Sequence, residues 1–280
     1  MAELLELFGL PSGVLPGIVA TDAEAGVTAA GLLGAEVPLR ARAGDQQAAC
    51  FGQGVRGVGE AKLTLGTSAM LDVCTGAEPS AVDGFYALPL WRLATGEDAF
   101  CLEGHVITAG AAVEWLLRLG LLDRAEDLDA AAERAGAGTV RFVPALAGLG
   151  APFGREDLRA SFTGLGLDAS REDLVAAVVD GIAQRCADLL DVTAPTAPVA
   201  VDGGLSRSRA LVQRIADLSG RVLAPAVEPE ATARGAAALA HGALPPLEHG
   251  RVEPRLDPAR RAEVRGAWAD ALAALLDGAA

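Results

Sequence analysis

The chain has 280 residues, of which 51% are apolar and 21% are charged, so it is long enough to bury the core of one large domain. Its net charge is −14, and it contains no basic run that would neutralise phosphates, which argues against a nucleic acid partner. No apolar run reaches the roughly 20 residues that span a bilayer, and no basic start followed by an apolar run indicates a secretory signal. We therefore expect a cytoplasmic protein that binds neither nucleic acid nor membrane.

The cysteines are widely spaced, and no two of them form a C-x-x-C pair. The three histidines do not cluster with them, so the sequence gives little support to a zinc site. We expect buried free thiols, as is usual in a reducing compartment. The cysteines are Cys50, Cys74, Cys101 and Cys186.

The first half of the chain predicts short strands that end at glycine turns. Residues 1–43 begin with a short amphipathic segment. Residues 61–75 have the composition of two strands around a Gly-Thr-Ser turn. Residues 98–110 are strand-like and end at a glycine, and residues 111–122 then carry apolar side chains at helical spacing.

The second half alternates strands with helices, which is typical of the α/β class. Residues 141–150 and 160–167 predict strands that run into glycine loops. Ser170 is expected to cap the next helix, with Asp173 in the capping-box position. The remaining expected elements are a buried strand that breaks at Gly203 and Gly204, a helix over 207–219, a strand over 221–227, a helix over 230–244, a Pro-rich linker over 245–256 and a last helix opened by Asp257 and Pro258.

Three junctions between a strand and a turn share one chemical character: Gly66-Thr67-Ser68, Ala109-Gly110-Ala111 and Asp202-Gly203-Gly204. Glycine lets a backbone approach a ligand closely, and free amides at a turn or a helix start attract phosphate. Each junction alone is also what an ordinary tight turn needs. Three in one α/β chain favour a nucleotide site, although neither G-x-x-x-x-G-K-[ST] nor G-x-G-x-x-G occurs.

Asp45 stands in the polar stretch "GDQQAACFGQ", and its residues leave two interpretations open. Asp45 is a candidate N-cap of the helix that follows. It is also a candidate carboxylate that orients and deprotonates a substrate hydroxyl as that hydroxyl attacks a phosphate. Spacing along the sequence does not decide between the two.

Six segments occur here in an order that resembles the FGGY carbohydrate kinases, and they are most similar to the glycerol kinase branch. Residues 160–180, "ASFTGLGLDASREDLVAAVVD", fit the second signature of that family throughout, and the resemblance extends over about residues 3–245. The six segments are "AGDQQAACFGQ", "GEAKLTLGTSAML", "CLEGHVITAGAAVEWL", "RFVPALAGLGAPF", "VAVDGGLSRS" and "EATARGAAALA".

The resemblance implies an actin-like ATPase (ribonuclease H-like) fold of the α/β class, with the active site in a cleft between two related domains. It implies that Asp45 is the general base and that Gln46 contacts the sugar or polyol substrate. It implies ATP as the phosphate donor and Mg²⁺ bridging its phosphates, with no residue of this chain assigned to the metal. The residues that match nucleotide-binding positions are Gly66, Thr67, Gly110, Glu114, Gly204 and Ser208.

The resemblance also implies that most of the family's first domain is missing, since members of the family are about twice as long. We expect residues 1–55 to be a remnant of the first domain, residues 56–244 to be the C-terminal nucleotide-binding domain, and residues 245–280 to be a linker and a final helix. Apolar residues of the remnant would then be exposed or repacked, and they form a predicted association surface: Leu4, Leu5, Leu7 and Leu10. A separate N-terminal kinase half, or self-association through residues 1–55, is the expected protein partner.

Smaller departures from the family concern the ligands. Glu114 stands where glycerol kinases commonly have an amide, and Ser208 stands where they commonly have an asparagine. Residues 151–158, "APFGREDL", lack the usual aromatic pair. The segment "CLEGHV" resembles glycerol kinases more than xylulokinases, which favours a small polyol over a ketose.

Three functions remain open on the sequence. In the first, the chain is the C-terminal part of a kinase. It would need the first domain to phosphorylate a substrate and would be inactive alone. Alternatively, it is a non-catalytic module derived from such a kinase, which binds nucleotide or a protein partner. A third alternative, another actin-like enzyme such as an acetate kinase, fits the glycine turns but not the six ordered segments.

Overall fold

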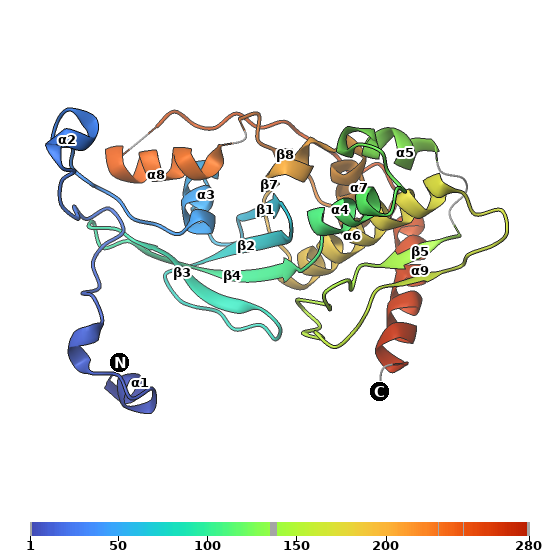
Figure 1. The fold of residues 1–280 in the computed structure, drawn as a ribbon, viewed down its shortest axis with the longest axis horizontal. Helices are drawn as coiled ribbons and strands as arrows, with labels where there is room; N and C mark the ends of the chain where they lie inside the picture. Colours follow the sequence, from blue (N-terminus) through green and yellow to red (C-terminus); the bar gives the residue numbers. More distant parts are fainter. Residues whose placement is uncertain (1, 135–138, 229, 243, 279–280) are drawn as a thin grey trace.

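The computed structural model describes residues 2–134, 139–228, 230–242 and 244–278. A six-stranded sheet with the order β3-β4-β2-β1-β7-β8 lies at the centre, and helices cover both of its faces (Figure 1). Its strands are β1 (Ala61–Leu65), β2 (Ala69–Gly76), β3 (Tyr86–Arg92), β4 (Asp98–Val106), β7 (Val199–Asp202) and β8 (Leu223–Pro225). A separate two-stranded sheet contains β5 (Arg141–Val143) and β6 (Ser161–Thr163).

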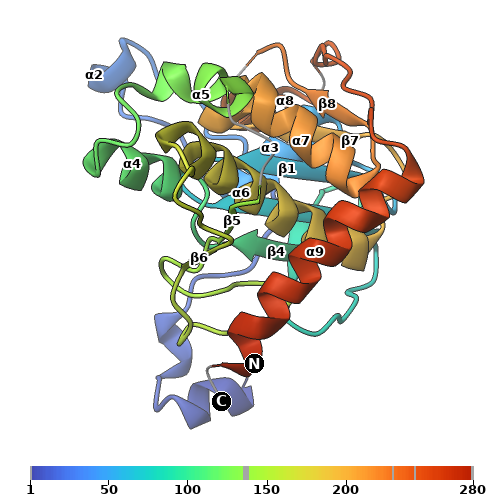
Figure 2. The ribbon, with the colours of Figure 1, turned by 90° about the vertical axis from the view of Figure 1, so that its right-hand side faces the viewer.

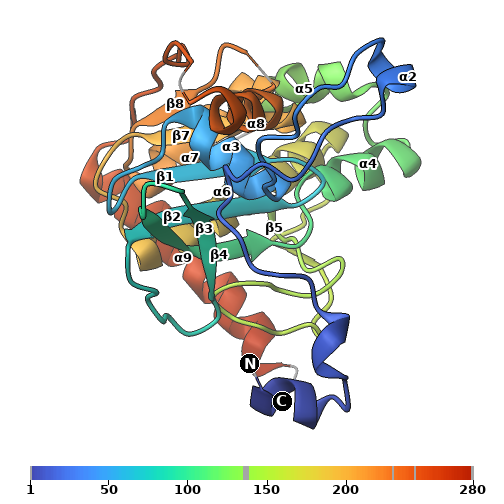
Figure 3. The ribbon, with the colours of Figure 1, turned by 90° about the vertical axis from the view of Figure 1, so that its left-hand side faces the viewer.

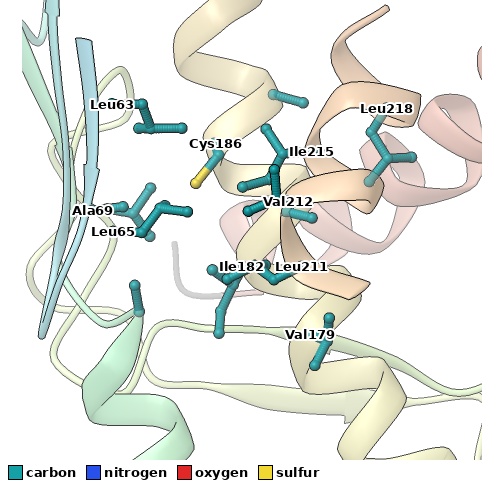
Figure 4. Packing of buried hydrophobic residues seen from close by; sticks show 14 of the residues in the cluster. Leu63, Leu65, Ala69, Val179, Ile182, Cys186, Leu211, Val212, Ile215 and Leu218 are labelled. Carbon is teal, nitrogen blue, oxygen red and sulfur yellow. The ribbon is translucent and has the colours of Figure 1, made fainter. Parts of the chain in front are cut away.

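The helices, in chain order, are α1 (Ala2–Leu7), α2 (Ala30–Leu33), α3 (Asp45–Gln53), α4 (Gly110–Arg118), α5 (Leu128–Arg134), α6 (Arg171–Thr193), α7 (Arg209–Ser219), α8 (Ala231–His241) and α9 (Pro258–Asp277). Helices α3 and α8 cover one face of the central sheet, and α6 and α7 cover the other (Figure 3 and Figure 4). Among the described residues, no helix is both long and apolar enough to cross a membrane.

The central sheet is mixed. β1 pairs antiparallel with β2 across the Gly-Thr-Ser turn, and β4 and β3 continue this antiparallel half. On its other side β1 pairs parallel with β7, and β7 pairs parallel with β8. The carboxyl ends of β1 and β7 therefore lie side by side, so the turns that follow them meet at one edge of the sheet.

Alternate residues of β1 face different layers. Leu63 and Leu65 are fully buried, and Figure 4 shows them pointing toward α6 and α7, together with Ala69 of β2. Lys62 and Thr64, which alternate with these leucines, lie on the opposite face, under α3. Figure 3 shows α3 and α8 over that face. The sheet thus has one apolar face and one face that carries polar side chains.

The long helix α6 begins where the sequence predicts. The Ser170 hydroxyl accepts a hydrogen bond from the Asp173 amide, and the Asp173 carboxylate accepts one from the Ser170 amide, so the capping box is confirmed. A Cβ atom at Gly181 would lie 2.2 Å from the carbonyl oxygen of Phe142. The glycine therefore lets β5 pass directly over the helix, which brings the small sheet onto α6.

The final helix α9 lies across the outside of α6 (Figure 2). Asp257 caps it, with Pro258 as its first residue, as the sequence predicts. Trp268 and Leu272 are buried in a small core with residues of the segment between β5 and β6. These apolar contacts attach the C-terminal helix to the rest of the fold.

Residues 2–44 run along the outside of the molecule and away from the sheet (Figure 3). They join the end of β3, where the Thr21 amide donates to the Arg92 carbonyl at 2.7 Å. The expected exposure of apolar residues is confirmed at Leu4, Leu7 and Leu10, which are 54, 75 and 44% exposed. Leu5, the fourth residue of the predicted surface, is half-buried.

Several elements differ from the sequence-based expectation. The strand β3 was not predicted, because Pro89 interrupts its pattern and strand prolines occur only at edges. The helix expected from residue 207 begins at Arg209, because residues 204–207 form a 3₁₀ turn and Ser208 caps the helix. The prediction for the cysteines is confirmed, since all four are free and buried.

Candidate functional site

The first two glycine junctions contact each other directly. The carbonyl oxygens of Gly66 and Thr67 accept hydrogen bonds of 2.9 to 3.0 Å from the amides of Ala109, Gly110 and Ala111. A Cβ atom at Gly110 would lie 2.6 Å from the Gly66 carbonyl oxygen, so only glycine fits there. The start of α4 is thereby fixed against the turn between β1 and β2.

The third junction lies beside them. Gly203 follows β7 with a φ of 88°, and a Cβ atom there would lie 2.5 Å from the Leu65 carbonyl oxygen. Gly204 and Thr67 are exposed, so this edge of the sheet opens to solvent. The structure therefore brings the three predicted junctions together at the carboxyl ends of β1 and β7.

The amides at the start of α4 are not free, contrary to the idea that they attract phosphate. Those of Ala109, Gly110 and Ala111 are used by the turn carbonyls. Gly110 therefore allows the backbone at the start of α4 to approach the backbone of the turn between β1 and β2 closely. The Thr67 side chain is exposed, and its hydroxyl makes no hydrogen bond with any described residue. The Thr67 hydroxyl is therefore available to a ligand, whereas the first amides of α4 are not.

Glu114 and Ser208 have different surroundings. Glu114 is exposed on α4, one helical turn after Gly110, so the two lie on the same side of the helix. The Ser208 hydroxyl donates to a carboxylate oxygen of Asp129 and accepts from the Leu211 amide at 3.2 Å. The second Asp129 oxygen accepts from the Arg209 amide at 2.9 Å. Asp129 was not singled out in the sequence, because α5 and α7 are far apart along the chain.

Asp45 is the first residue of α3, and the N-cap is Gly44, so the prediction of Asp45 as the cap is wrong. One Asp45 carboxylate oxygen, Oδ1, accepts from the amide of its neighbour Gln46 at 2.9 Å, and Oδ2 makes no hydrogen bond with a described residue. The side chain is exposed. Because Gly44 occupies the N-cap position, the Asp45 carboxylate does not cap the helix and is available to a ligand.

Gln46 leads into a buried polar network that the sequence did not reveal. Its Oε1 accepts from Lys62 Nζ at 2.5 Å. The same ammonium donates to Thr64 Oγ1 at 2.8 Å and forms an ion pair with Asp72 Oδ2 at 2.9 Å. Lys62 is fully buried, and Asp72 lies directly opposite it in the β1–β2 pair. A lysine and a threonine that alternate with the leucines of a buried strand were the signal available in the sequence.

Glu103 extends this network across the sheet. It lies opposite Asp72 in the β2–β4 pair. Burial raises the pKa of the Glu103 carboxyl from an ordinary 4.5 to about 7, and the negative charges of Asp72 and Asp45 add to the effect. Glu103 therefore continues the row of charged side chains that runs from Lys62 through Asp72 across the sheet.

A second buried chain of hydrogen bonds runs from the other end of α3. Gln53 Nε2 donates to Asp202 Oδ2 at 3.0 Å, and Gln53 Oε1 lies 2.6 Å from His249 Nε2. Asp202 is buried, and its Oδ1 has no hydrogen-bond partner. Because Asp202 precedes Gly203, this chain connects α3, which carries Asp45, to the strand that ends at the glycine junctions.

Comparisons with known proteins agree with this architecture. Residues 61–244 match the C-terminal domain of the FGGY family of carbohydrate kinases. The glycerol kinase of Thermus brockianus is 39% identical over 284 residues, which cover 95% of this chain and 57% of that protein. The glycerol kinase of Methylobacterium nodulans is 36% identical over 298 residues, covering 98% of this chain and 59% of that protein.

Solved structures give the same result. The crystal structure of Plasmodium falciparum glycerol kinase with ADP superposes with a TM-score of 0.89 at 27% identity, over 98% of this chain and 59% of that one. A xylulose kinase from Brucella ovis has a TM-score of 0.80 at 29% identity, over 98% of this chain and 61% of that one.

The mixed sheet with its helical layers is thus the α/β fold of the actin-like ATPases, as found in sugar kinases. The chain belongs to the FGGY family of carbohydrate kinases and contains that family's C-terminal domain. It spans somewhat more than half the length of the curated relatives that it matches.

Proposed function

We propose that this chain forms the base-bearing and nucleotide-binding side of an ATP-dependent kinase that phosphorylates a hydroxyl of a small polyol or sugar. The observation that carries the proposal is the exposed carboxylate of Asp45, held at the start of a helix whose buried polar contacts reach the strand ending at the glycine junctions. Family membership and the similarity to glycerol kinases support a polyol as the acceptor.

In the proposed reaction the substrate hydroxyl oxygen attacks the terminal phosphorus of ATP. The new O–P bond forms, the bond to the bridging oxygen breaks, and ADP leaves. Asp45 accepts the hydroxyl proton, and Gln46 contacts the substrate beside it. Catalysis of this kind depends mainly on positioning and on neutralising phosphate charge.

On the nucleotide side, we propose that Gly66 and Thr67 contact the phosphates. Gly110, Glu114, Gly204 and Ser208 would border the rest of the nucleotide. Mg²⁺ would neutralise the phosphate oxygens when bound. Among the described residues, no group of three His, Cys, Asp or Glu side chains is arranged to hold a metal ion.

The exposed apolar side chains of residues 2–44 support a protein partner for this region. We propose that it contacts a first kinase domain, which would supply the remaining phosphate and substrate contacts. Removing one group that stabilises a transition state typically costs about 10²- to 10³-fold. The chain without such a domain is then expected to release no detectable ADP in response to a polyol.

The test measures ADP release with Mg-ATP and a panel of glycerol, other polyols and ketoses. The chain is assayed alone and after mixing with the first-domain part of the Thermus brockianus glycerol kinase. Asp45→Asn is the test variant, and Asp270→Asn, an exposed acid on α9, is the matched control. We expect release that depends on the acceptor in the mixture, lost in Asp45→Asn and kept in Asp270→Asn.

A non-catalytic module is the second candidate function, and the same assay distinguishes it. Such a module, whether it binds nucleotide or a protein partner, would release no ADP in any mixture, and Asp45→Asn would change nothing. The bonding of the Ser208 hydroxyl and of the first amides of α4 within the protein is the observation that favours it.

A further inference from the structure

The Lys62 ammonium has three oxygen neighbours: it donates hydrogen bonds to two of them and forms an ion pair, without hydrogen-bond geometry, with the third. They are, in that order, Gln46 Oε1 at 2.5 Å, Thr64 Oγ1 at 2.8 Å and Asp72 Oδ2 at 2.9 Å. An ammonium group has donors only, so every partner must present an acceptor to it. The amide of Gln46 therefore has to turn its oxygen toward Lys62.

The same contact determines where the other end of the amide points. With Oε1 held by Lys62, Nε2 is directed away from the lysine, and it makes no hydrogen bond with any residue that the structure describes. Gln46 is half-buried and adjoins Asp45 at the start of α3. The site thus presents a pair of unlike groups: a carboxylate that accepts and an amide nitrogen that donates.

The charge on Lys62 is well supported. Burial by itself lowers the pKa of the ammonium, but Asp72, Cys50 and Asp202 outweigh this and raise the pKa above its ordinary value. Asp72 lies opposite Lys62 in the sheet, and Glu103 lies opposite Asp72, so the lysine is held by a row of side chains across three strands. A lysine fixed by neighbouring strands is a rigid support for a side chain on a helix.

We propose that Lys62 is a positioning residue, which holds the Gln46 amide so that Nε2 donates to an oxygen of the substrate beside the hydroxyl that Asp45 deprotonates. The inference rests on the proposed function, since it takes the ligand of Gln46 to be a polyol or sugar. It assigns a direction to that contact: Gln46 recognises an acceptor oxygen of the substrate.

Gln46→Glu tests the oxygen and the nitrogen of the amide separately, because it keeps an acceptor oxygen and removes the donor nitrogen. A carboxylate still accepts from Lys62, so the folded protein should be at least as stable as the original in urea unfolding. The donor at Nε2 is lost, so the KM for glycerol should rise about tenfold, while the KM for ATP stays unchanged. Both are measured in the mixture of this chain with the first-domain part of the Thermus brockianus glycerol kinase. A variant with unchanged or lower KM for glycerol would show that Gln46 contacts the substrate through its oxygen, and would overturn the inference.

Lys62 itself is tested without relying on catalysis. Lys62→Met in an Asp72→Asn background removes both charges of the pair, and Asp72→Asn alone is the matched control that keeps the lysine. Side-chain ¹⁵N relaxation of Gln46 is measured in the whole chain. We expect an ordered amide in the original and in Asp72→Asn, and a mobile amide in the double variant. An amide that stays ordered without Lys62 would overturn the inference.

The two measurements also distinguish failure of the inference from failure of the proposed function. If the amide becomes mobile in the double variant but no mixture ever releases ADP, the positioning stands and the kinase proposal fails. If the mixture is active and the double variant raises the KM for glycerol no more than Asp72→Asn does, the inference fails and the kinase proposal stands. If the double variant does not fold, Gln46→Glu alone decides.

Discussion

Gly235 of α8 lies so close to Ala48 of α3 that a Cβ atom at Gly235 would be 1.7 Å from the Ala48 carbonyl oxygen. Gly52 makes the reciprocal approach, since a Cβ atom there would be 2.2 Å from the Ala231 carbonyl oxygen. The two helices therefore pack backbone against backbone. The position of Asp45, at the start of α3, depends on a helix that is distant in sequence.

Gly235→Ala should accordingly destabilise the protein. The added methyl group meets backbone, which cannot turn aside, so we expect a loss of about 2–3 kcal/mol in the free energy of unfolding. Gly266→Ala in α9 is the control, because nothing lies within 4 Å of its Cβ position. That change should stabilise by about 0.5–1 kcal/mol through helix propensity. Urea unfolding of both variants checks the difference in sign.

Gly204→Ala tests the proposed nucleotide edge. No protein atom lies within 4 Å of a Cβ atom at Gly204, so the free energy of unfolding should change little. If the nucleotide approaches this backbone, the methyl group should weaken ATP binding about tenfold or more, measured by calorimetry. Unchanged ATP affinity would remove Gly204 from the site.

Arg265→Ala should weaken the attachment of α9 to α6 and lower the free energy of unfolding. The Arg265 guanidinium donates to Gln184 Oε1 at 2.6 Å, Asp188 Oδ1 at 2.7 Å and Asp191 Oδ2 at 2.8 Å. Asp188 is buried but keeps its ion pair with Arg185, so the lost hydrogen bonds to charged groups should cost about 1–3 kcal/mol. Limited proteolysis should then cleave the C-terminal helix first.

Arg260→Ala is the control for this loss. Its ion pair with Glu263 also lies on α9 but is exposed, so removing it should change the free energy of unfolding by about 0–1 kcal/mol. Equal losses for the two arginines would show that the contacts of Arg265 do not hold α9 in place.

Local signals in the sequence predicted much of the fold, because the contacts that start helices and form turns join residues close together in the chain. The capping box of Ser170 and Asp173 and the turn around Thr67 are formed by residues close together in the chain. The resemblance of six ordered segments predicted the family, which the comparisons confirmed. The roles of Asp45 and Gln46 in a reaction stay predictions, since no ligand contact bears on them.

The contacts that position the site could not be predicted from the sequence. Lys62 meets Gln46 only because β1 runs under α3, and Ser208 meets Asp129 only because α5 lies against α7. Strand pairing and helix packing create such pairs, and no local pattern encodes them. The engagement of the α4 amides by the Gly66 and Thr67 carbonyls is of the same kind.

Glu103 should make stability depend on pH. The pKa of its carboxyl rises from 4.5 to about 7 on folding, mainly through burial, so the folded protein holds this proton more tightly than the unfolded chain. The stabilisation is fully present below pH 4.5 and is lost as the pH rises through about 7. Because the group is only half-buried, we expect a loss of about 1 kcal/mol.

Glu103→Gln isolates this contribution, since a neutral amide mimics the protonated carboxyl at every pH. Unfolding free energies measured between pH 5 and pH 8 should fall less with pH in Glu103→Gln than in the original protein, by about 1 kcal/mol across the range. Glu78→Gln, at an exposed position, should follow the original curve. Parallel curves for all three proteins would mean that Glu103 is ionised throughout this range, and that the row from Lys62 to Glu103 carries an additional negative charge.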